Sequence, residues 1–307
     1  MNVLVTGASG FVGTHLVRAL ADTFAGSTIV GTHFGEEQDS GSCIFLDVTD
    51  KDAVRRVIRK AQPEVVFHLA GFSSVGKSHL HPDTCMNVNA GGTGNMLEGV
   101  ASEASRARVL VVGSAEAYGV PRYLPIDEKH ALKPVSPYGA SRLEQERACD
   151  RHVRERGTHV IFTRSFNHTG PGQPDGFAVS SFAKQIATAD PDKPGAVRAG
   201  NLDAMRDFSD VRDVVAAYIA LIEGGEQGGK YNVCSGKAFQ IAALMDMMIA
   251  ISGKELHVET DPARLRPNDI PVLLGSCEKL IKATGWRRAF TIEDTLRDLL
   301  LSWAKTS

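Results

Sequence analysis

Short runs of apolar, often β-branched residues alternate with longer amphipathic stretches through the first half of the chain. The apolar runs predict strands at residues 3–6, 28–31, 43–46, 65–69, 109–112 and 159–163. The amphipathic stretches predict helices at 11–24, 50–61, 84–105 and 137–156. Alternation of this kind is typical of βαβ units, so we expect a parallel sheet with helices on both faces.

The alternation weakens after Arg164. A segment rich in glycine and proline at 168–176 predicts a long loop. Further helices are predicted at 177–189, 211–223, 242–252 and 291–304, with short strands between them. We therefore expect an α/β protein: a Rossmann-type, doubly wound domain over 1–165, its sheet completed by parts of 205–234, and a smaller C-terminal α/β domain over 166–307.

Composition and charge mainly exclude classes of protein. The net charge of -2 leaves no basic excess for nucleic acid or anionic lipid. No apolar run approaches the ~20 residues of a membrane helix, and the first residues lack a signal-peptide pattern. The five cysteines are widely spaced and form no C-x-x-C. We therefore expect reduced thiols in a cytoplasmic protein, without a disulfide framework or a metal site.

Three glycines follow the first predicted strand and open the first predicted helix. Gly7, Gly10 and Gly13 are spaced as G-x-x-G-x-x-G. Gly7 allows the tight turn, Gly10 lets backbone amides approach a pyrophosphate, and Gly13 lets the helix pack closely on the sheet. In its strand–turn–helix context this spacing predicts a dinucleotide site.

The end of the second predicted strand bears on the choice of cofactor. An acidic residue there would bind the adenosine ribose and favour NAD, but no carboxylate occurs before Glu36. This favours NADP slightly, with NAD as the alternative. No arginine is present to bind a 2′-phosphate, and His33 is a candidate substitute.

A second glycine-rich stretch, at 71–78, matches the G-x-x-x-x-G-K-S phosphate loop of nucleoside triphosphatases. Such a loop should open a helix, but Pro82 follows within a turn and is tolerated only in a first helical turn. No later apolar strand ends in the aspartate that would hold magnesium. We therefore do not favour a triphosphatase.

A hydroxyl, a phenol and a cation form the main chemical constellation. Ser114 follows the fifth predicted strand, whereas Tyr138 and Arg142, four residues apart, share one face of a helix. These groups suit the reduction of a carbonyl by hydride transfer. Tyr138 would protonate the oxygen, Ser114 would donate a hydrogen bond to it, and Arg142 would make the phenol more acidic.

These motifs resemble the extended short-chain dehydrogenase/reductase family over essentially the whole chain. The resemblance rests on the glycines of 6–13, Asp47-Val48, His68-Leu69-Ala70-Gly71, the Ser114/Tyr138 pair and Asn167-x-x-Gly170-Pro171. Within that family, the segments 164–173, 206–208, 231–236 and 261–264 are similar to those of GDP-6-deoxy-4-keto-mannose reductases.

The resemblance implies a cytoplasmic, homodimeric enzyme that reduces the C4 ketone of GDP-4-keto-6-deoxy-D-mannose to GDP-D-rhamnose. In relatives, apolar stripes on the helices corresponding to 84–105 and 137–156 form the dimer. The cofactor contacts implied are Gly7, Gly10, Phe11, Val12, Gly13, His33, Asp47, Val48, Leu69, Ala70, Gly71, Tyr138 and Arg142. The substrate contacts implied are Ser73, Asn167, Val179, Lys184, Arg206, Arg266 and Asp269, with Arg206 and Lys184 near the pyrophosphate and Asp269 near the guanine.

Two positions keep alternatives open. Arg142 stands where the family has lysine; arginine keeps the charge but cannot relay protons as a lysine might, so we expect slower activity. Glu116 matches the carboxylate that removes a proton next to the ketone in dehydratase relatives. A nucleotide-sugar dehydratase or epimerase therefore stays open, as does a non-enzymatic cofactor-binding protein in which Arg142 marks lost catalysis.

Overall fold

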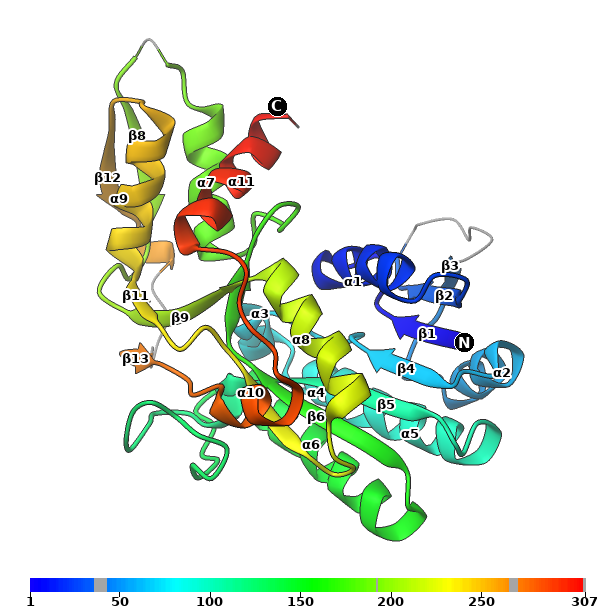
Figure 1. Cartoon of the computed structure of the whole chain (residues 1–307). Coiled ribbons are helices and arrows are strands. Elements are labelled where there is room, and N and C mark those ends of the chain that lie inside the picture. Colours follow the sequence, from blue (N-terminus) through cyan, green and yellow to red (C-terminus); the bar gives the residue numbers. More distant parts are fainter. Residues whose placement is uncertain (36–42, 192, 265–269, 306–307) are drawn as a thin grey trace.

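A seven-stranded parallel sheet forms the centre of the larger part of the molecule (Figure 1). The computed structural model describes residues 1–35, 43–191, 193–264 and 270–305. The strand order is β10-β6-β5-β4-β1-β2-β3. The strands are β1 (Asn2–Thr6), β2 (Thr28–His33), β3 (Cys43–Phe45), β4 (Val65–His68), β5 (Arg108–Ser114), β6 (His159–Ser165) and β10 (Lys230–Val233). An edge strand from the second half of the chain therefore joins the sheet.

Helices cover both faces of this sheet. On one face lie α1 (Phe11–Thr23), α8 (Val211–Gly224) and α10 (Glu278–Thr284); on the other lie α2 (Lys51–Ala61), α5 (Gly92–Glu103) and α6 (Pro137–Arg156). Successive residues of β1 serve the two cores, since Val3 and Val5 belong to the first and Leu4 to the second. Burial on both faces explains why the strands are continuous apolar runs. The expected doubly wound α/β fold is confirmed.

The helix predicted over 84–105 is interrupted. The elements here are α3 (Val75–Leu80), α4 (Pro82–Met86) and a π-helical turn, η1 (Asn87–Gly91), which leads into α5. Pro82 ends α3 and occupies the first turn of α4, as proline geometry requires. Asn89 in the π turn is fully buried and bonds to the backbone of Phe72 and to the Ser141 hydroxyl. Wide turns of this kind often occur at functional sites.

A smaller group of elements lies beyond the carboxyl ends of the sheet strands (Figure 1). Its strands are β7 (Asn167–Thr169), β8 (Gly195–Ala199), β9 (Met205–Asp210), β11 (Ala238–Gln240), β12 (Leu256–Thr260) and β13 (Val272–Leu273). Strand β9 pairs with β7, β11 and β13, and β8 pairs with β12. The helices α7 (Ala178–Thr188), α9 (Ile241–Ser252) and α11 (Ile292–Ala304) enclose a third core around Phe182, Leu244 and Leu299.

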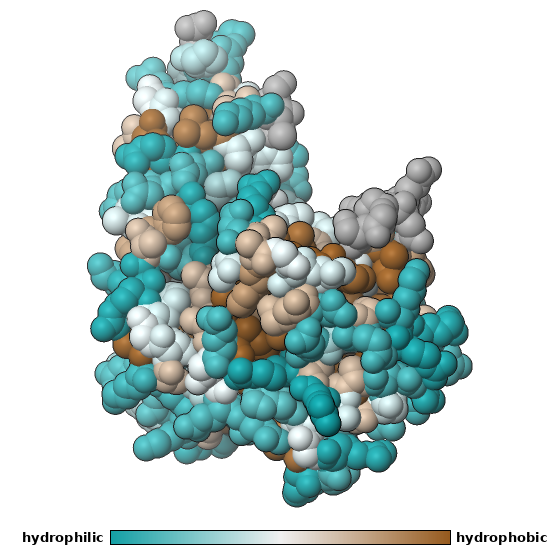
Figure 2. Space-filling view, turned by 45° about the vertical axis from the view of Figure 1, so that its right-hand side comes forward, coloured by the Kyte–Doolittle hydropathy of each residue, from teal (hydrophilic) through white to brown (hydrophobic). Residues whose placement is uncertain are grey.

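The surface is largely hydrophilic on the face shown in Figure 2, with hydrophobic side chains gathered near the middle of the molecule. Among the residues that the structure describes, no helix is both long and apolar enough to cross a bilayer. The same residues contain no cluster of three or more histidine, cysteine or acidic side chains placed to hold a metal ion.

Candidate active site

A cavity of about 590 Å³ opens at the carboxyl ends of β1, β4, β5 and β6. Its lining comes from the glycine-rich turn after β1, the ends of β2 and β5, the loop after β4, the start of α6 and the segment 165–177. Both parts of the molecule therefore contribute to one site. In doubly wound folds, ligands bind at this end of the strands.

In the glycine-rich turn, the backbone packs closely against itself and against the loop after β4. Gly7 has a φ of 71°, and a Cβ there would lie 2.9 Å from the amide nitrogen of Ala70. A Cβ on Gly13 would lie only 2.2 Å from the carbonyl oxygen of Gly7. The turn leads directly into α1, whose first turn carries no acidic side chain. The amides of the first turn of α1, which lack acceptors within the helix, and the positive end of the α1 dipole fit the pyrophosphate of a dinucleotide.

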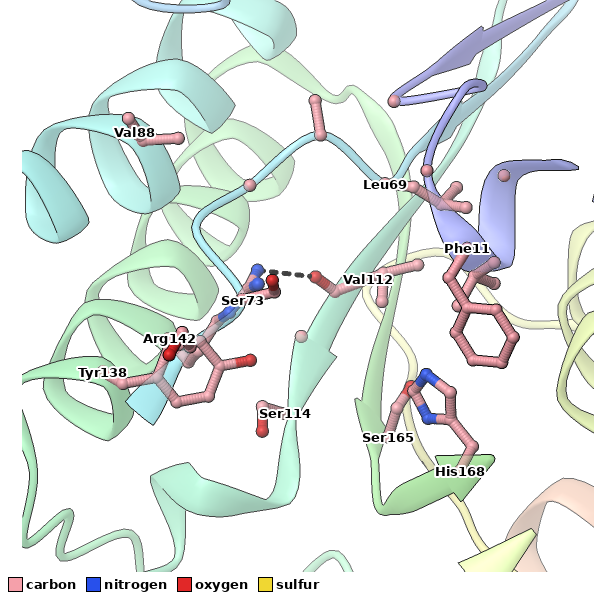
Figure 3. Close-up of a pocket in the computed structure, with 18 of the residues that line it drawn as sticks. Phe11, Leu69, Ser73, Val88, Val112, Ser114, Tyr138, Arg142, Ser165 and His168 are labelled. Atoms are coloured by element: carbon pink, nitrogen blue, oxygen red, sulfur yellow. Dashed lines mark hydrogen bonds between the residues drawn. The ribbon is translucent and has the colours of Figure 1, made fainter. Parts of the chain in front are cut away.

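The start of α6 places the phenol opposite the end of β5. Ser136 caps the helix by accepting a hydrogen bond from Gly139 N at 3.0 Å, and this fixes Tyr138 in the first turn. Ser114 Oγ accepts a hydrogen bond from Glu116 N at 3.2 Å. Figure 3 shows the Tyr138 hydroxyl pointing toward the strand that carries Ser114. Both side chains and Glu116 line the same cavity.

Arg142 lies one turn after Tyr138, with its guanidinium 5.1 Å from the centre of the phenol ring. Its Nη1 donates to Val112 O at 3.1 Å, the bond drawn in Figure 3, and to the Gln145 side chain. Its Nη2 donates to Phe72 O at 3.1 Å. The arginine therefore keeps a positive charge beside the phenol while bridging the loop after β4 and the end of β5.

Comparison with known proteins identifies the family. Residues 4–299 match the GDP-mannose 4,6-dehydratase family. The chain is 34% identical to a GDP-6-deoxy-D-mannose reductase of Pseudomonas aeruginosa, over 98% of this chain and 96% of the relative. The chain belongs to the GDP-mannose 4,6-dehydratase family. Its members are extended short-chain dehydrogenases/reductases, as the sequence motifs predicted.

Two further relatives are similar over nearly their whole length. A GDP-6-deoxy-D-talose 4-dehydrogenase of Aggregatibacter actinomycetemcomitans is 28% identical over 95% of this chain and 94% of its own. The solved structure of RMD from Pseudomonas aeruginosa complexed with NADPH superimposes with a TM-score of 0.87, at 31% identity and with both chains fully covered.

In this member of the GDP-mannose 4,6-dehydratase family, the structure brings together all thirteen residues expected to contact the cofactor, since each lines the cavity. Of the expected substrate contacts, Ser73 and Asn167 also line it. Val179 does not, because its side chain is 2% exposed and belongs to the core of the smaller part.

Lys184 and Arg206 also lie outside the cavity lining. Lys184 pairs with Asp175 and approaches the Trp303 ring, and Arg206 is buried with Nη1 donating to Met205 O at 2.9 Å. The two remaining candidates, Arg266 and Asp269, fall outside the described residues.

Sequence reasoning missed His168, although it lies in one of the segments that carry the family resemblance. Its ring stacks on Phe11 at a centroid distance of 6.1 Å and forms the wall opposite Tyr138 (Figure 3). Burial lowers the pKa of His168, so the imidazole is neutral near pH 7. Nδ1 must carry the hydrogen, because its partner is the Phe166 carbonyl at 3.0 Å. Nε2 is therefore a hydrogen-bond acceptor.

Tyr218 of α8 was also missed, because its helix is remote in sequence from the other cavity residues. Its hydroxyl lies 2.7 Å from Ser165 Oγ at the end of β6. Burial raises the pKa of Tyr218 to about 12, which keeps this phenol protonated. Tyr218 therefore serves as a hydrogen-bonding wall of the cavity.

Proposed function

We propose that the protein reduces the C4 ketone of GDP-4-keto-6-deoxy-D-mannose to GDP-D-rhamnose with NADPH, NADH being the alternative reductant. The observation that carries the proposal is the placement of Tyr138 and Ser114 in the same cavity as a glycine-rich dinucleotide turn. The similarity to a GDP-6-deoxy-D-mannose reductase over nearly the whole chain supports the choice of substrate.

The cavity residues have complementary roles in this reaction. A nicotinamide held by the glycine-rich turn and the cavity would supply the hydride that C4 receives. Tyr138 holds the proton that passes to the ketone oxygen, and the nearby positive charge of Arg142 favours the phenolate that remains. Ser114 Oγ already accepts a hydrogen bond from Glu116 N, so its own proton can be directed at the ketone oxygen. Both hydroxyls therefore stabilise the charge that develops on one atom.

The smaller part of the chain would bind the GDP group. Ser73 and Asn167 would contact the sugar, and their position in the cavity lining supports this proposal. We propose that Lys184 and Arg206, which lie outside this cavity, contact the pyrophosphate. We further propose that Arg266 contacts the nucleotide and that Asp269 contacts its guanine. Val179 would act indirectly, by shaping α7 from its buried side.

A second candidate function rests on Glu116, which lines the same cavity. A carboxylate there could remove a proton next to the ketone, which is the chemistry of a nucleotide-sugar dehydratase or epimerase. Such an enzyme would return its hydride to the sugar and would consume no NADPH overall. In the reductase, Glu116 would orient the sugar.

The test is to mix the purified protein with NADPH and GDP-4-keto-6-deoxy-D-mannose, then follow cofactor absorbance and identify the product by NMR. We expect one NADPH oxidised per ketone and a GDP-D-rhamnose product. A GDP-D-talose product would correct the face of hydride attack. Turnover of GDP-mannose without net oxidation would favour the dehydratase, and an absence of turnover would overturn both functions.

We further propose a homodimer and a cytoplasmic location. The dimer rests on the family resemblance, in which the helices corresponding to 84–105 and 137–156 form the interface. The free cysteines support a reducing compartment. Light scattering should give twice the chain mass of 32.9 kDa. A mass of one chain at micromolar concentration would overturn the dimer, and fractionation of the source cells tests the location.

A further inference from the structure

A line of buried hydrogen bonds connects Arg142 with the strand that leads into the glycine-rich turn. Gln145 Oε1 accepts from Arg142 Nη1 at 3.0 Å, and Gln145 Nε2 donates to Thr93 Oγ1 at 2.9 Å. The Thr93 oxygen lies 3.0 Å from Nε2 of His68, and Nδ1 of His68 lies 2.8 Å from the Thr6 hydroxyl. Each of these side chains is at most 5% exposed. Together they form the buried relay Thr6–His68–Thr93–Gln145–Arg142.

The relay supplies one of the hydrogen-bond acceptors that fix the orientation of the Arg142 guanidinium. Arg142 donates to two backbone carbonyls, of Val112 and Phe72, and among the described residues its one side-chain acceptor is Gln145. Arg142 Nε is buried without a hydrogen-bond partner in the described structure. A guanidinium is planar and larger than the ammonium of lysine, so its orientation needs several fixed acceptors.

Thr93, the next member of the relay, fixes the orientation of the Gln145 side-chain amide. Thr93 accepts from the amide nitrogen of Gln145, so the amide oxygen must face Arg142. Burial, helped by the charge of Arg142, lowers the pKa of His68 to about 3, and the imidazole therefore stays neutral. Consequently Arg142 is the charged member of the relay, and its partners hold it through neutral hydrogen bonds.

We propose that Gln145 is a positioning residue that holds the charge of Arg142 beside Tyr138 through this relay. The inference rests on the proposed function, in which that charge favours the Tyr138 phenolate. Without the Gln145 acceptor, one Nη1 hydrogen loses its partner and the guanidinium can turn away from the phenol. The phenolate would then lose part of its electrostatic stabilisation.

The first test replaces Gln145 by Met, which has similar volume and no hydrogen-bonding amide. We expect kcat to fall about tenfold while KM for the GDP-sugar stays within about twofold, because Gln145 is fully buried and does not line the cavity. We also expect the high-pH decline of kcat to move up by roughly half a pH unit, the effect of moving a charge by about 2 Å from the phenol.

The ionisation of Tyr138 gives a readout that needs no substrate. Ultraviolet difference titration against Tyr138→Phe reports its phenolate, and we expect the same upward shift in Gln145→Met. The titratable groups that share the cavity with the phenol are His33, Asp47, Glu116, Arg142, His168 and Tyr218. The buried His68 interacts electrostatically with Arg142. If the wild type proves inactive, the proposed function fails and this titration still tests Gln145.

Two more variants complete the experiment. Thr93→Val removes the central hydroxyl of the relay with little change in volume. If Gln145→Met does not fold, this variant tests whether the relay positions Arg142. Cys149→Ala is the matched control, because Cys149 is buried one turn further along α6 and belongs to the core rather than the relay. We expect Thr93→Val to shift the phenolate titration and Cys149→Ala to leave it unchanged. Folded relay variants with wild-type kcat and titration would overturn the proposal.

Discussion

Replacing Gly13 by alanine tests the nucleotide turn through one added methyl group. The new Cβ would lie 2.2 Å from the Gly7 carbonyl oxygen and 2.7 Å from Ala8 Cα. Relief requires the backbone of the turn to move by about 1 Å, since carbon and oxygen atoms pack at roughly 3.2 Å or more. These atoms belong to the glycine-rich turn, so their movement would also displace the backbone proposed to hold the pyrophosphate.

Two opposing terms set the stability change in Gly13→Ala. Overpacking against backbone costs roughly 1–3 kcal/mol, whereas alanine in place of glycine within a helix gains about 1 kcal/mol. We therefore expect a net loss of stability of about 0–2 kcal/mol and a larger effect on NADPH binding. If the turn loses 1.4–2.8 kcal/mol of pyrophosphate contacts, Kd for NADPH rises about ten- to a hundredfold.

The assay is a fluorescence titration of NADPH, with thermal unfolding measured alongside. Gly94→Ala is the matched control, because a Cβ at Gly94 of α5 meets no atom within 4 Å. That variant should bind NADPH normally and be up to about 1 kcal/mol more stable. A Gly13→Ala protein that binds NADPH as tightly as the wild type would refute the reasoning.

Two further predictions concern the relay and its cation. Arg142→Lys keeps the charge, but a single ammonium cannot reach all three acceptors of the guanidinium. We therefore expect the free energy of unfolding in urea to fall by about 1–3 kcal/mol. We also expect both kcat and its pH profile to change. Wild-type rate, pH profile and stability would show that the arginine has no special role. His68 binds its proton with a folded pKa of about 3 instead of 6.5, so the unfolded state binds more protons and stability falls as the pH drops below 6.5. Its contribution approaches about 1.4 kcal/mol per pH unit, and His68→Asn should lose that part of the slope between pH 7 and 5; an unchanged slope would contradict a buried, neutral His68.

The fold was largely predictable because its signals are local. Each strand–turn–helix unit carries its own apolar run and its own cap or glycine turn, and helix α6 occupies the predicted residues 137–156. The interruption at Asn89 was not predictable, because it depends on hydrogen bonds to Phe72 and Ser141 across the fold. No periodicity in the helix sequence reports such partners.

The same distinction between local signals and contacts across the fold separates the site residues that were predicted from those that were not. Most residues expected around the cofactor follow soon after strands, and a parallel sheet brings such positions to one edge. Tyr138 and Arg142 lie on α6, whose start meets the same cavity. The substrate side depends on how the smaller part folds back, and there Val179 lies in a core rather than in the cavity. Gln145 carries no motif at all; its role emerges only when Arg142, Thr93 and His68 are seen in contact.

The most direct measurement compares the rate of NADPH oxidation in the wild type, Tyr138→Phe and Ser114→Ala, each saturated with GDP-4-keto-6-deoxy-D-mannose. If both hydroxyls meet the ketone oxygen, loss of the phenol should lower kcat by about a thousandfold or more, and loss of the serine hydroxyl by about a hundredfold. NADPH binding should be little changed in Ser114→Ala. Wild-type turnover by a correctly folded Tyr138→Phe protein would contradict the account.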